Sequence, residues 1–346
     1  MSILFADPGG EHYFSLGMPG GNKWTTNSSM TLTSSAPAGR RTTYAITGGG
    51  SGFGMEKNIP GSPARVIAGA AVYIPASWLN ATATTIMSFK DAGTVQVDFR
   101  VTSTGAIQIT RNGTQLGSLS TNLLTNGSGW HYFEFDATIN PSTGSAQVWV
   151  DNVSWLSVSG QNTRATSNSF AGTVRFYAGN SGQAASQWKD IYILDPSSGL
   201  YSARLGDSEA VCVYPNAAGA NQQWTNTGGA SQTASVQDGR SGSGTRPDGD
   251  TSYISDSTSG HISDFAHDTL SAGTIWAVIH DSYVRSDAGT ASFNQVAISG
   301  GTTRTTAQST GASYSYFSDV METDPNTSSA WTLANFNAAT FGVGIP

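Results

Sequence analysis

The sequence predicts an all-β protein of two consecutive antiparallel, jelly-roll-like β-sandwich domains, with at most one short helix near the C-terminus. The first observation is that Gly, Ser, Thr and Asn interrupt nearly every window of about eleven residues, which disfavours helices. The second is a series of short segments in which apolar and polar residues alternate. The third is an aromatic content of 10%, which separates this Gly-rich chain from a disordered one.

The clearest strands lie in the first half of the chain. Residues 94–101 place Val95, Val97 and Phe99 on one face, and the Asn-Gly pair at 112–113 is a type I′ hairpin signal. Segments with similar strand character complete the spacing expected of a sandwich. They are residues 65–75, 85–89, 106–109, 131–136, 144–151, 173–177 and 188–195.

The domain boundary is expected at the break Pro196-Ser197-Ser198-Gly199, because Pro, Ser and Gly without apolar alternation mark linkers. The predicted domains are therefore residues 1–197 and 198–346. In the second domain, central strands are expected at residues 274–280 and 291–298. The only helix candidate runs from Trp331 to Thr340.

The charge distribution argues against nucleic-acid and membrane partners. The net charge is -7, and no basic cluster is longer than Arg40-Arg41, whereas nucleic-acid binders cluster Lys and Arg. The apolar run near the start, Ile3 to Ala6, is too short for a signal peptide or a membrane span. We therefore expect synthesis and folding in a cytoplasm.

The first domain resembles the laminin-G and concanavalin A-like jelly-roll superfamily at two places. One is the strand that opens with Trp130-His131-Tyr132 and ends at Asp136, which is similar to the family's Trp-His strand. The other is the segment from Gly144 to Val153, similar to a family strand that ends in an Asp-Gly turn. Asn152 replaces that Gly and still permits a left-handed turn.

The second domain resembles the C-terminal part of phage virion proteins that carry such a lectin-like domain. The resemblance implies a non-enzymatic surface protein of the virion, a capsid decoration or a tail-associated protein, assembled in the host cytoplasm. Its expected partners are other virion proteins and copies of itself, with a trimer as the working assumption. The matching segments are Val213–Asn216, Pro247–Tyr253, Val284–Thr290 and Glu322–Trp331, together with Trp188–Asp195.

Glu134-Phe135-Asp136 is the constellation closest to an active site. Jelly-roll glycoside hydrolases place three alternating carboxylates on one strand face, where they act as nucleophile, helper and acid. The third carboxylate is missing, because residue 138 is Thr, so a glycan depolymerase is the least favoured of the functions considered.

Among the histidines, His12, His131 and His280 have no neighbouring Ser and acid in a recognisable order, which predicts no nucleophilic hydrolysis.

No cofactor is expected, and calcium is the one metal left open. Asp248-Gly249-Asp250 with Asp256 has the carboxylate density that calcium prefers, but the spacing departs from an EF-hand and favours a turn. His261, Asp264, His267 and Asp268 contain zinc-binding residue types. On one strand the two histidines would lie about 20 Å apart, which favours a structural role.

Recognition of a bacterial surface glycan is the alternative to a purely structural role. Exposed tryptophans stack on sugar faces, and three tryptophans lie in polar surroundings, Trp24, Trp155 and Trp224. These three are the candidate glycan-binding residues. The competing interpretation is that each is a core residue, since Trp is heavily buried on average.

Overall fold

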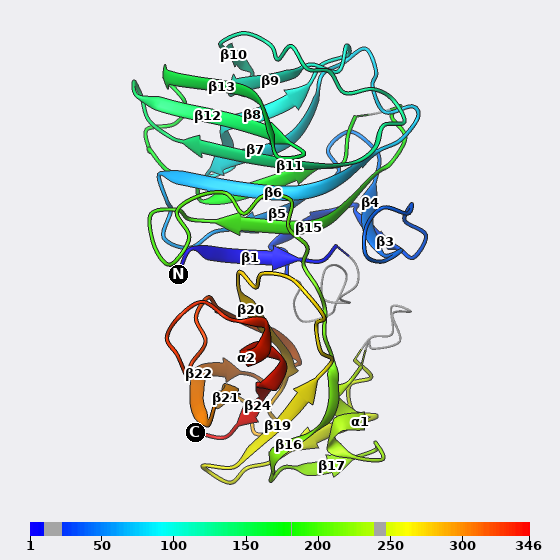
Figure 1. Cartoon of the computed structure of the whole chain (residues 1–346), viewed down its shortest axis with the longest axis vertical. Helices are drawn as coiled ribbons and strands as arrows, with labels where there is room; N and C mark the ends of the chain where they lie inside the picture. Colours follow the sequence, from blue (N-terminus) through cyan, green and yellow to red (C-terminus); the bar gives the residue numbers. More distant parts are fainter. Residues whose placement is uncertain (10–22, 181, 239–246) are drawn as a thin grey trace. The chain divides into compact units, whose positions relative to one another are not determined.

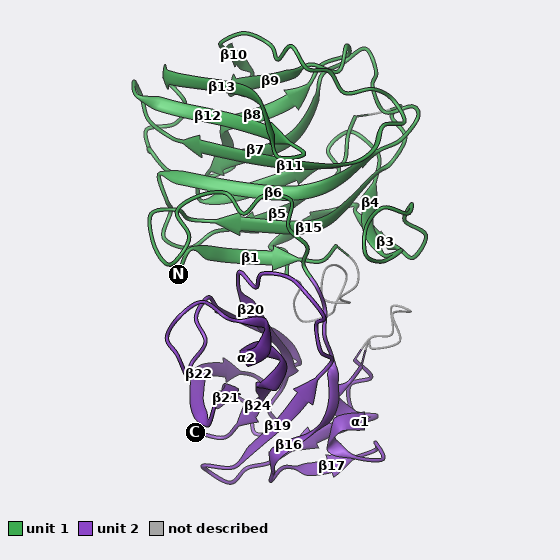
Figure 2. Cartoon of the chain, viewed as in Figure 1, with its two compact units in different colours: residues 1–11, 23–210 green, residues 12–22, 211–346 purple. Residues whose placement is uncertain are grey.

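The computed structural model describes residues 1–9, 23–180, 182–238 and 247–346, and His12 lies outside them. The described chain is nearly all β, with 48% strand and 3% helix, so the predicted fold class is confirmed. The chain divides into two compact units (Figure 2). Unit 1 contains Lys23–Ala210 and the first residues of the chain, and unit 2 contains Val211–Pro346. Within the described residues, no helix is long and apolar enough to cross a membrane.

Unit 1 is a sandwich of two antiparallel sheets, visible as two layers of strands in Figure 1. We call the larger the front sheet and the smaller the back sheet. In spatial order the front sheet is β13 (Val153–Gln161), β12 (Gly144–Val150), β11 (Gly129–Thr138), β6 (Arg65–Ile74), β15 (Ser186–Leu194), β4 (Ala45–Gly48) and β3 (Thr31–Thr33), with β1 (Ile3–Asp7) paired to β15. The back sheet is β10 (Thr114–Leu116), β9 (Ile107–Arg111), β8 (Thr94–Val101), β7 (Thr84–Asp91), β14 (Thr173–Tyr177), β5 (Gly54–Asn58) and β2 (Thr26–Ser28).

Two tight turns of unit 1 follow the sequence closely. Asn112 and Gly113, with φ of 43° and 87°, connect β9 to β10 and confirm the predicted hairpin. Asp151 and Asn152, with φ of 51° and 66°, connect β12 to β13. The left-handed turn expected at Asn152 is therefore present, and it determines where the side chain of Asp151 lies.

Unit 2 is built on a five-stranded antiparallel sheet with two short ribbons. The sheet order is β16 (Pro215–Gln222), β19 (Ile262–His267), β24 (Thr340–Gly344), β21 (Ala291–Ser299) and β22 (Thr302–Thr310). The ribbons are β17 (Thr225–Thr227) with β18 (Tyr253–Ser255), and β20 (Val278–Val284) with β23 (Ser315–Met321). Strand β20 thus begins later than the segment 274–280 predicted.

The two helices of the described chain are each a turn or two long. Helix α2 (Leu333–Ala338) lies inside the segment predicted as a helix and begins at the N-cap Thr332, whose side chain accepts from the Asn335 N–H. Its Phe336 joins the core of unit 2 with Trp331 and Met321. Helix α1 (Gln232–Val236) was not predicted, because its Gln, Thr, Ala, Ser and Val give no apolar period.

The segment that follows the predicted boundary at Ser197 lies against unit 1. The Tyr201 N–H donates to the Ser2 hydroxyl at 2.9 Å, and the Ala210 N–H donates to Asp190 Oδ1 at 3.1 Å. We call residues 201–210 the covering segment. Its backbone hydrogen bonds go to residues of unit 1, and the two compact units divide after Ala210 and not after Ser197.

Candidate functional site

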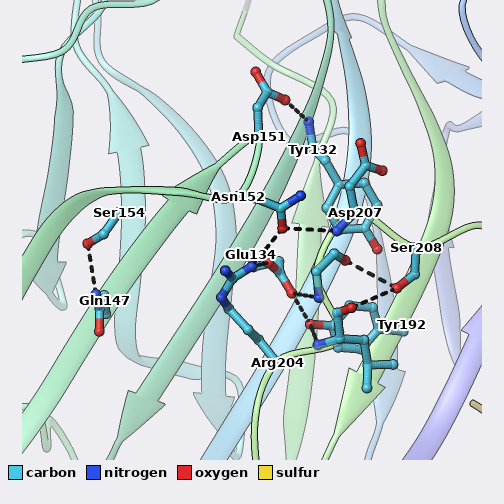
Figure 3. Close-up of polar contacts among 12 residues, drawn as sticks. Tyr132, Glu134, Gln147, Asp151, Asn152, Ser154, Tyr192, Arg204, Asp207 and Ser208 are labelled. Atoms are coloured by element: carbon cyan, nitrogen blue, oxygen red, sulfur yellow. Dashed lines mark hydrogen bonds and ion pairs between the residues drawn. The ribbon is translucent and has the colours of Figure 1, made fainter.

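The outer face of the front sheet is determined by the side-chain alternation along β11. Phe133 and Phe135 point inward and pack on rings of the back sheet, with centroid distances of 5.9 and 4.8 Å. Successive side chains of a strand point to opposite faces, so Tyr132, Glu134 and Asp136 point outward. The covering segment lies on this face (Figure 3).

Glu134 is buried beneath the covering segment, with 1% of its surface exposed. Oε1 accepts hydrogen bonds from the Tyr192 hydroxyl and, at 2.8 Å, from the Gly206 N–H. Oε2 forms an ion pair with the guanidinium of Arg204 (Figure 3). The same guanidinium lies over the Trp149 ring, 5.1 Å from its centroid. Every oxygen of this carboxylate is therefore engaged within the chain.

Asp136, the second carboxylate of the predicted constellation, is held by a bidentate pair. The Arg65 guanidinium donates to its two oxygens at 2.9 and 2.6 Å. This pair lies at a hollow of about 350 Å³, which we call the Arg65 hollow. Its remaining lining is mostly hydroxyl and amide side chains, Thr138, Ser145, Gln147, Ser157 and Ser159, with Ala146 and Val158.

A second hollow, of about 390 Å³, opens where β11 begins, and we call it the Trp130 hollow. It combines one aromatic ring with one cation and three carboxylates. The indole N–H of Trp130 donates to the Pro37 carbonyl at 3.1 Å, and a Cβ on Gly39 would come within 3.1 Å of the ring. Close approach at Gly39 thus holds the ring in place. The lining residues are Gly39, Arg40, Trp130, Asp151, Asp207 and Glu209.

Arg40 lies between the Trp130 hollow and Tyr132, on the outer face of the front sheet. Its side chain is 8% exposed, forms an ion pair with Asp207 at 2.7 Å and lies over the Tyr132 ring at 5.3 Å. Burial would lower the pKa of Arg40, but Asp207 and Asp190 raise it overall, so the guanidinium stays charged. The hollow therefore presents a fixed cation beside its carboxylates.

Asp190 lies behind Arg40 in the β-bulge of β15, with φ of 52°. Arg40 is 3.6 Å from Oδ2, and within the described chain this oxygen has no hydrogen-bond partner. Burial outweighs the attraction of Arg40 and raises the pKa of Asp190 to about 7. The buried side of the site therefore contains a carboxyl group that titrates near neutral pH.

The three tryptophans predicted to bind glycan do not form a site. Trp24 is 3% exposed, and its indole N–H donates to Asp7 Oδ2 at 2.8 Å, while Trp224 is 9% exposed. Neither offers a ring face to a sugar, so both predictions are wrong. Trp155 is half-buried in β13, outside the lining of both hollows. Trp130 lines the Trp130 hollow instead, and the sequence indicates it only as part of a strand similar to the family's.

The predicted cation ligands are each bound to other partners. Asp248 accepts from Ser252, Asp250 pairs with Arg285 at 2.9 Å, and Asp256 contacts His261 Nδ1 at 2.7 Å. Both ring nitrogens of His267 face backbone carbonyls. Within the residues that the structure describes, no three His, Cys, Asp or Glu side chains are grouped as metal ligands.

Sequence reasoning also missed the surroundings of His131. The structure places Ser128 and Asp151 on its two ring nitrogens, although Asp151 is far along the chain in the β12–β13 turn. The expectation that no histidine has a serine and an acid beside it is therefore wrong for His131. The available signal was Gly127-Ser128-Gly129, a turn just before the strand.

Gly69 of β6 lies directly under the Tyr192 ring, and replacing it tests the packing around Glu134. A Cβ would come within 2.3 Å of Tyr192 Cε1, and the Tyr192 hydroxyl is held by Glu134 and by the Leu205 N–H at 3.2 Å. We expect Gly69→Ala to lower the free energy of unfolding of unit 1 by about 2 kcal/mol in urea denaturation. Gly172→Ala, where a Cβ meets nothing within 4 Å, is the control and should change it little. Equal effects would show that the Tyr192 ring can move aside.

Comparisons with known proteins leave the family of this chain open. No family model matches, and no curated protein matches. Among solved structures, a cellulose induced protein, Cip1, is 15% identical over 53% of this chain and 91% of its own, with a TM-score of 0.39. A structure reported for the interaction of botulinum neurotoxin type C with ganglioside molecules is 9% identical over 49% of this chain and 42% of its own, with a TM-score of 0.36.

The alginate lyase Aly36B is 13% identical over 43% of this chain and 78% of its own, with a TM-score of 0.31. At these TM-scores the likenesses assign no function to this chain. The side chains of the site therefore have to indicate its function.

Proposed function

We propose that unit 1 recognises a neutral carbohydrate at the Trp130 hollow, and that the protein acts primarily by binding. The observation that carries the proposal is a half-buried tryptophan ring with Arg40, Asp151, Asp207 and Glu209 around one hollow. An apolar ring beside a few fixed polar groups is the usual composition of a small-ligand site. The ring would pack on the C–H face of a sugar, and the polar groups would bond its hydroxyls.

The charge of the hollow supports a neutral ligand over an anionic one. Three carboxylates line it, Asp151, Asp207 and Glu209, against the single cation Arg40. An acidic sugar would face like charges at short range, which weakens binding. We therefore expect neutral hexose or pentose chains to bind, and sialylated or uronate-rich chains to bind poorly.

The state of the two β11 carboxylates supports binding over depolymerisation. Glu134 is capped by the covering segment, and Asp136 is paired with Arg65. A retaining or inverting glycosidase needs one carboxyl group able to donate a proton and a second that reaches the sugar or a water. Neither role suits a carboxylate whose oxygens are already occupied by cations and hydrogen-bond donors.

Glycan-array binding of the full chain tests the proposal. We expect selective binding to neutral glycans, and Trp130→Ala should weaken it by about 2 kcal/mol, roughly thirtyfold in Kd. Trp155→Ala is the matched control, since this half-buried tryptophan lies outside the hollow, and it should bind as the wild type does. Binding that survives Trp130→Ala, or that prefers acidic glycans, would remove the hollow as the site.

The place of this recognition in a phage particle rests on the resemblance of residues 198–346 to virion proteins. On that resemblance, a glycan-binding unit 1 would serve host recognition, with unit 2 toward other virion proteins or toward copies of the chain in an oligomer. Mass spectrometry of purified particles would detect the chain if this proposal holds. Its absence from particles would end the virion role without affecting the carbohydrate proposal.

A further inference from the structure

His131 is placed between a serine hydroxyl and a carboxylate. Its Nδ1 lies 2.7 Å from Asp151 Oδ2, and its Nε2 lies 2.9 Å from Ser128 Oγ. A carboxylate can only accept, so Nδ1 carries the proton and Nε2 accepts from the serine hydroxyl. This is the order of partners that turns a serine into a nucleophile, with the acid fixing the tautomer of the base.

Asp151 is held in position from its other side. Its Oδ1 accepts the Tyr132 N–H at 2.8 Å, and its Oδ2 contacts His131. Burial would raise the pKa of Asp151, but the bonds from His131 and from the Tyr132 N–H lower it overall. The carboxylate is thus ionised and oriented, which suits a positioning residue.

Ser128 lies at the tip of a turn, where a substrate can reach it. It is exposed and lies between Gly127 and Gly129, whose φ values of 74° and 89° are in the left-handed region. The Gly127 N–H donates to the Pro75 carbonyl at 3.0 Å, which fixes the turn on the end of β6. The hydroxyl is therefore presented by an ordered backbone.

We propose that Ser128, His131 and Asp151 form a hydrolytic site for an acyl ester carried by the neutral glycan of the Trp130 hollow. Asp151 connects the two features, because it both lines the hollow and holds His131. The identity of the substrate rests on the proposed carbohydrate function, whereas the reactivity of Ser128 does not. A neutral ester is favoured because the same carboxylates repel acidic substrates.

The reaction needs only water as its co-reactant. Ser128 Oγ bonds to the ester carbonyl carbon while its proton passes to His131 Nε2, and the tetrahedral adduct expels the sugar alkoxide, which takes that proton. Water then attacks the acyl-serine, again through His131. It releases the carboxylic acid and restores the serine hydroxyl.

A second His–Asp pair in the chain provides a matched control. His261 Nδ1 lies 2.7 Å from Asp256 Oδ2, the same separation as in the first pair. In the described part of the chain no serine hydroxyl contacts His261 Nε2. His261→Gln therefore removes an equivalent pair without removing the serine contact.

Labelling of the full chain with an alkyl fluorophosphonate, followed by peptide mapping, tests the reactivity. We expect one adduct, on Ser128, absent in Ser128→Ala and slowed by about 10² to 10⁴ in His131→Gln. Asp151→Asn keeps an acceptor for the Tyr132 N–H but favours the other tautomer of His131, so labelling should slow while the melting temperature stays near that of the wild type. His261→Gln should label at the wild-type rate.

No adduct on Ser128, or equal labelling of wild type and His131→Gln, would overturn the hydrolytic site.

Acetate release tests the substrate class, and it should be faster from an O-acetylated gluco-oligosaccharide than from an O-acetylated uronate oligosaccharide. Release from neither, or faster release from the uronate, would overturn the ester assignment. The fluorophosphonate carries no sugar. If Ser128 is labelled but the chain binds no glycan on the array, the carbohydrate proposal alone is refuted. If the chain binds neutral glycans but Ser128 is not labelled, the hydrolytic site alone is refuted.

Discussion

Arg204→Ala is expected to lower the free energy of unfolding of unit 1 by about 3 kcal/mol, because it leaves the buried carboxylate of Glu134 without its cation. Glu134 is 1% exposed, and its remaining donors are the Tyr192 hydroxyl and the Gly206 N–H. The substitution also removes the bond from Arg204 to Asn152 Oδ1 at 2.9 Å. Urea denaturation followed by tryptophan fluorescence measures the loss.

Two further variants separate the ion pair from general disruption of the surface. The guanidinium of Arg164 donates to an exposed, neutral partner, the Ser167 carbonyl at 3.2 Å, and within the described residues it neutralises no buried charge, so Arg164→Ala should change stability by less than about 0.5 kcal/mol. Adding Glu134→Gln to Arg204→Ala removes the buried charge and should recover part of the loss. If Arg204→Ala lowered the free energy of unfolding no more than Arg164→Ala does, the ion pair with Glu134 would not stabilise the covering segment on the front sheet.

Asp190→Asn is expected to stabilise unit 1 at pH 8 and to have little effect near pH 4. The pKa of Asp190 is raised to about 7, so the folded state keeps its proton over a range in which the unfolded chain has already lost it. The contribution of such a carboxyl to the free energy of unfolding is complete at a pH below its pKa in the unfolded chain. It is lost as the pH rises through its pKa in the folded state. Asparagine does not titrate, so the variant should gain up to about 4 kcal/mol at pH 8.

Asparagine suits this position in other respects. It tolerates the φ of 52°, and its amide oxygen can still accept from the Ala210 N–H. Asp207→Asn is the contrasting variant, since it weakens the Arg40 pair without relieving a buried charge, and it should give no gain at pH 8. Unfolding midpoints at pH 4 and pH 8 provide the test. An Asp190→Asn protein no more stable than wild type at pH 8 would contradict the buried, titrating carboxyl.

The positions of strands can be predicted from the alternation of apolar and polar residues, because successive side chains of a strand point to opposite faces of the sheet. Residues 94–101 form β8, with Val97 and Phe99 buried as predicted. The same pattern did not predict that the opposite face would be covered. Gln96 and Asp98 are also buried, Gln96 because the chain around Thr166 bonds to it and Asp98 because Thr110 and Arg100 do. Whether a strand face is buried in this way depends on residues far away in the sequence, which a short window does not include.

The candidate site was missed for the same reason. The Trp130 hollow joins Arg40 to Asp207 across 167 positions of sequence, and the chosen tryptophans were selected by polar neighbours in sequence. Trp24 shows why that choice failed, since Asp7 supplies the indole with a buried acceptor. The sequence did indicate that Glu134 and Asp136 lie on one face of a strand. It could not predict that Arg204 and Arg65 would neutralise them.

An indole NMR titration tests most directly whether Trp130 contacts a neutral sugar. The chain has nine tryptophans, and Trp130→Phe identifies the Trp130 signal by its loss from the ¹H–¹⁵N spectrum. On addition of the neutral oligosaccharide selected by the array, the Trp130 indole signal should shift progressively with ligand, while that of Trp155 stays in place. Saturable binding that shifts other indoles and leaves Trp130 unmoved would contradict the account.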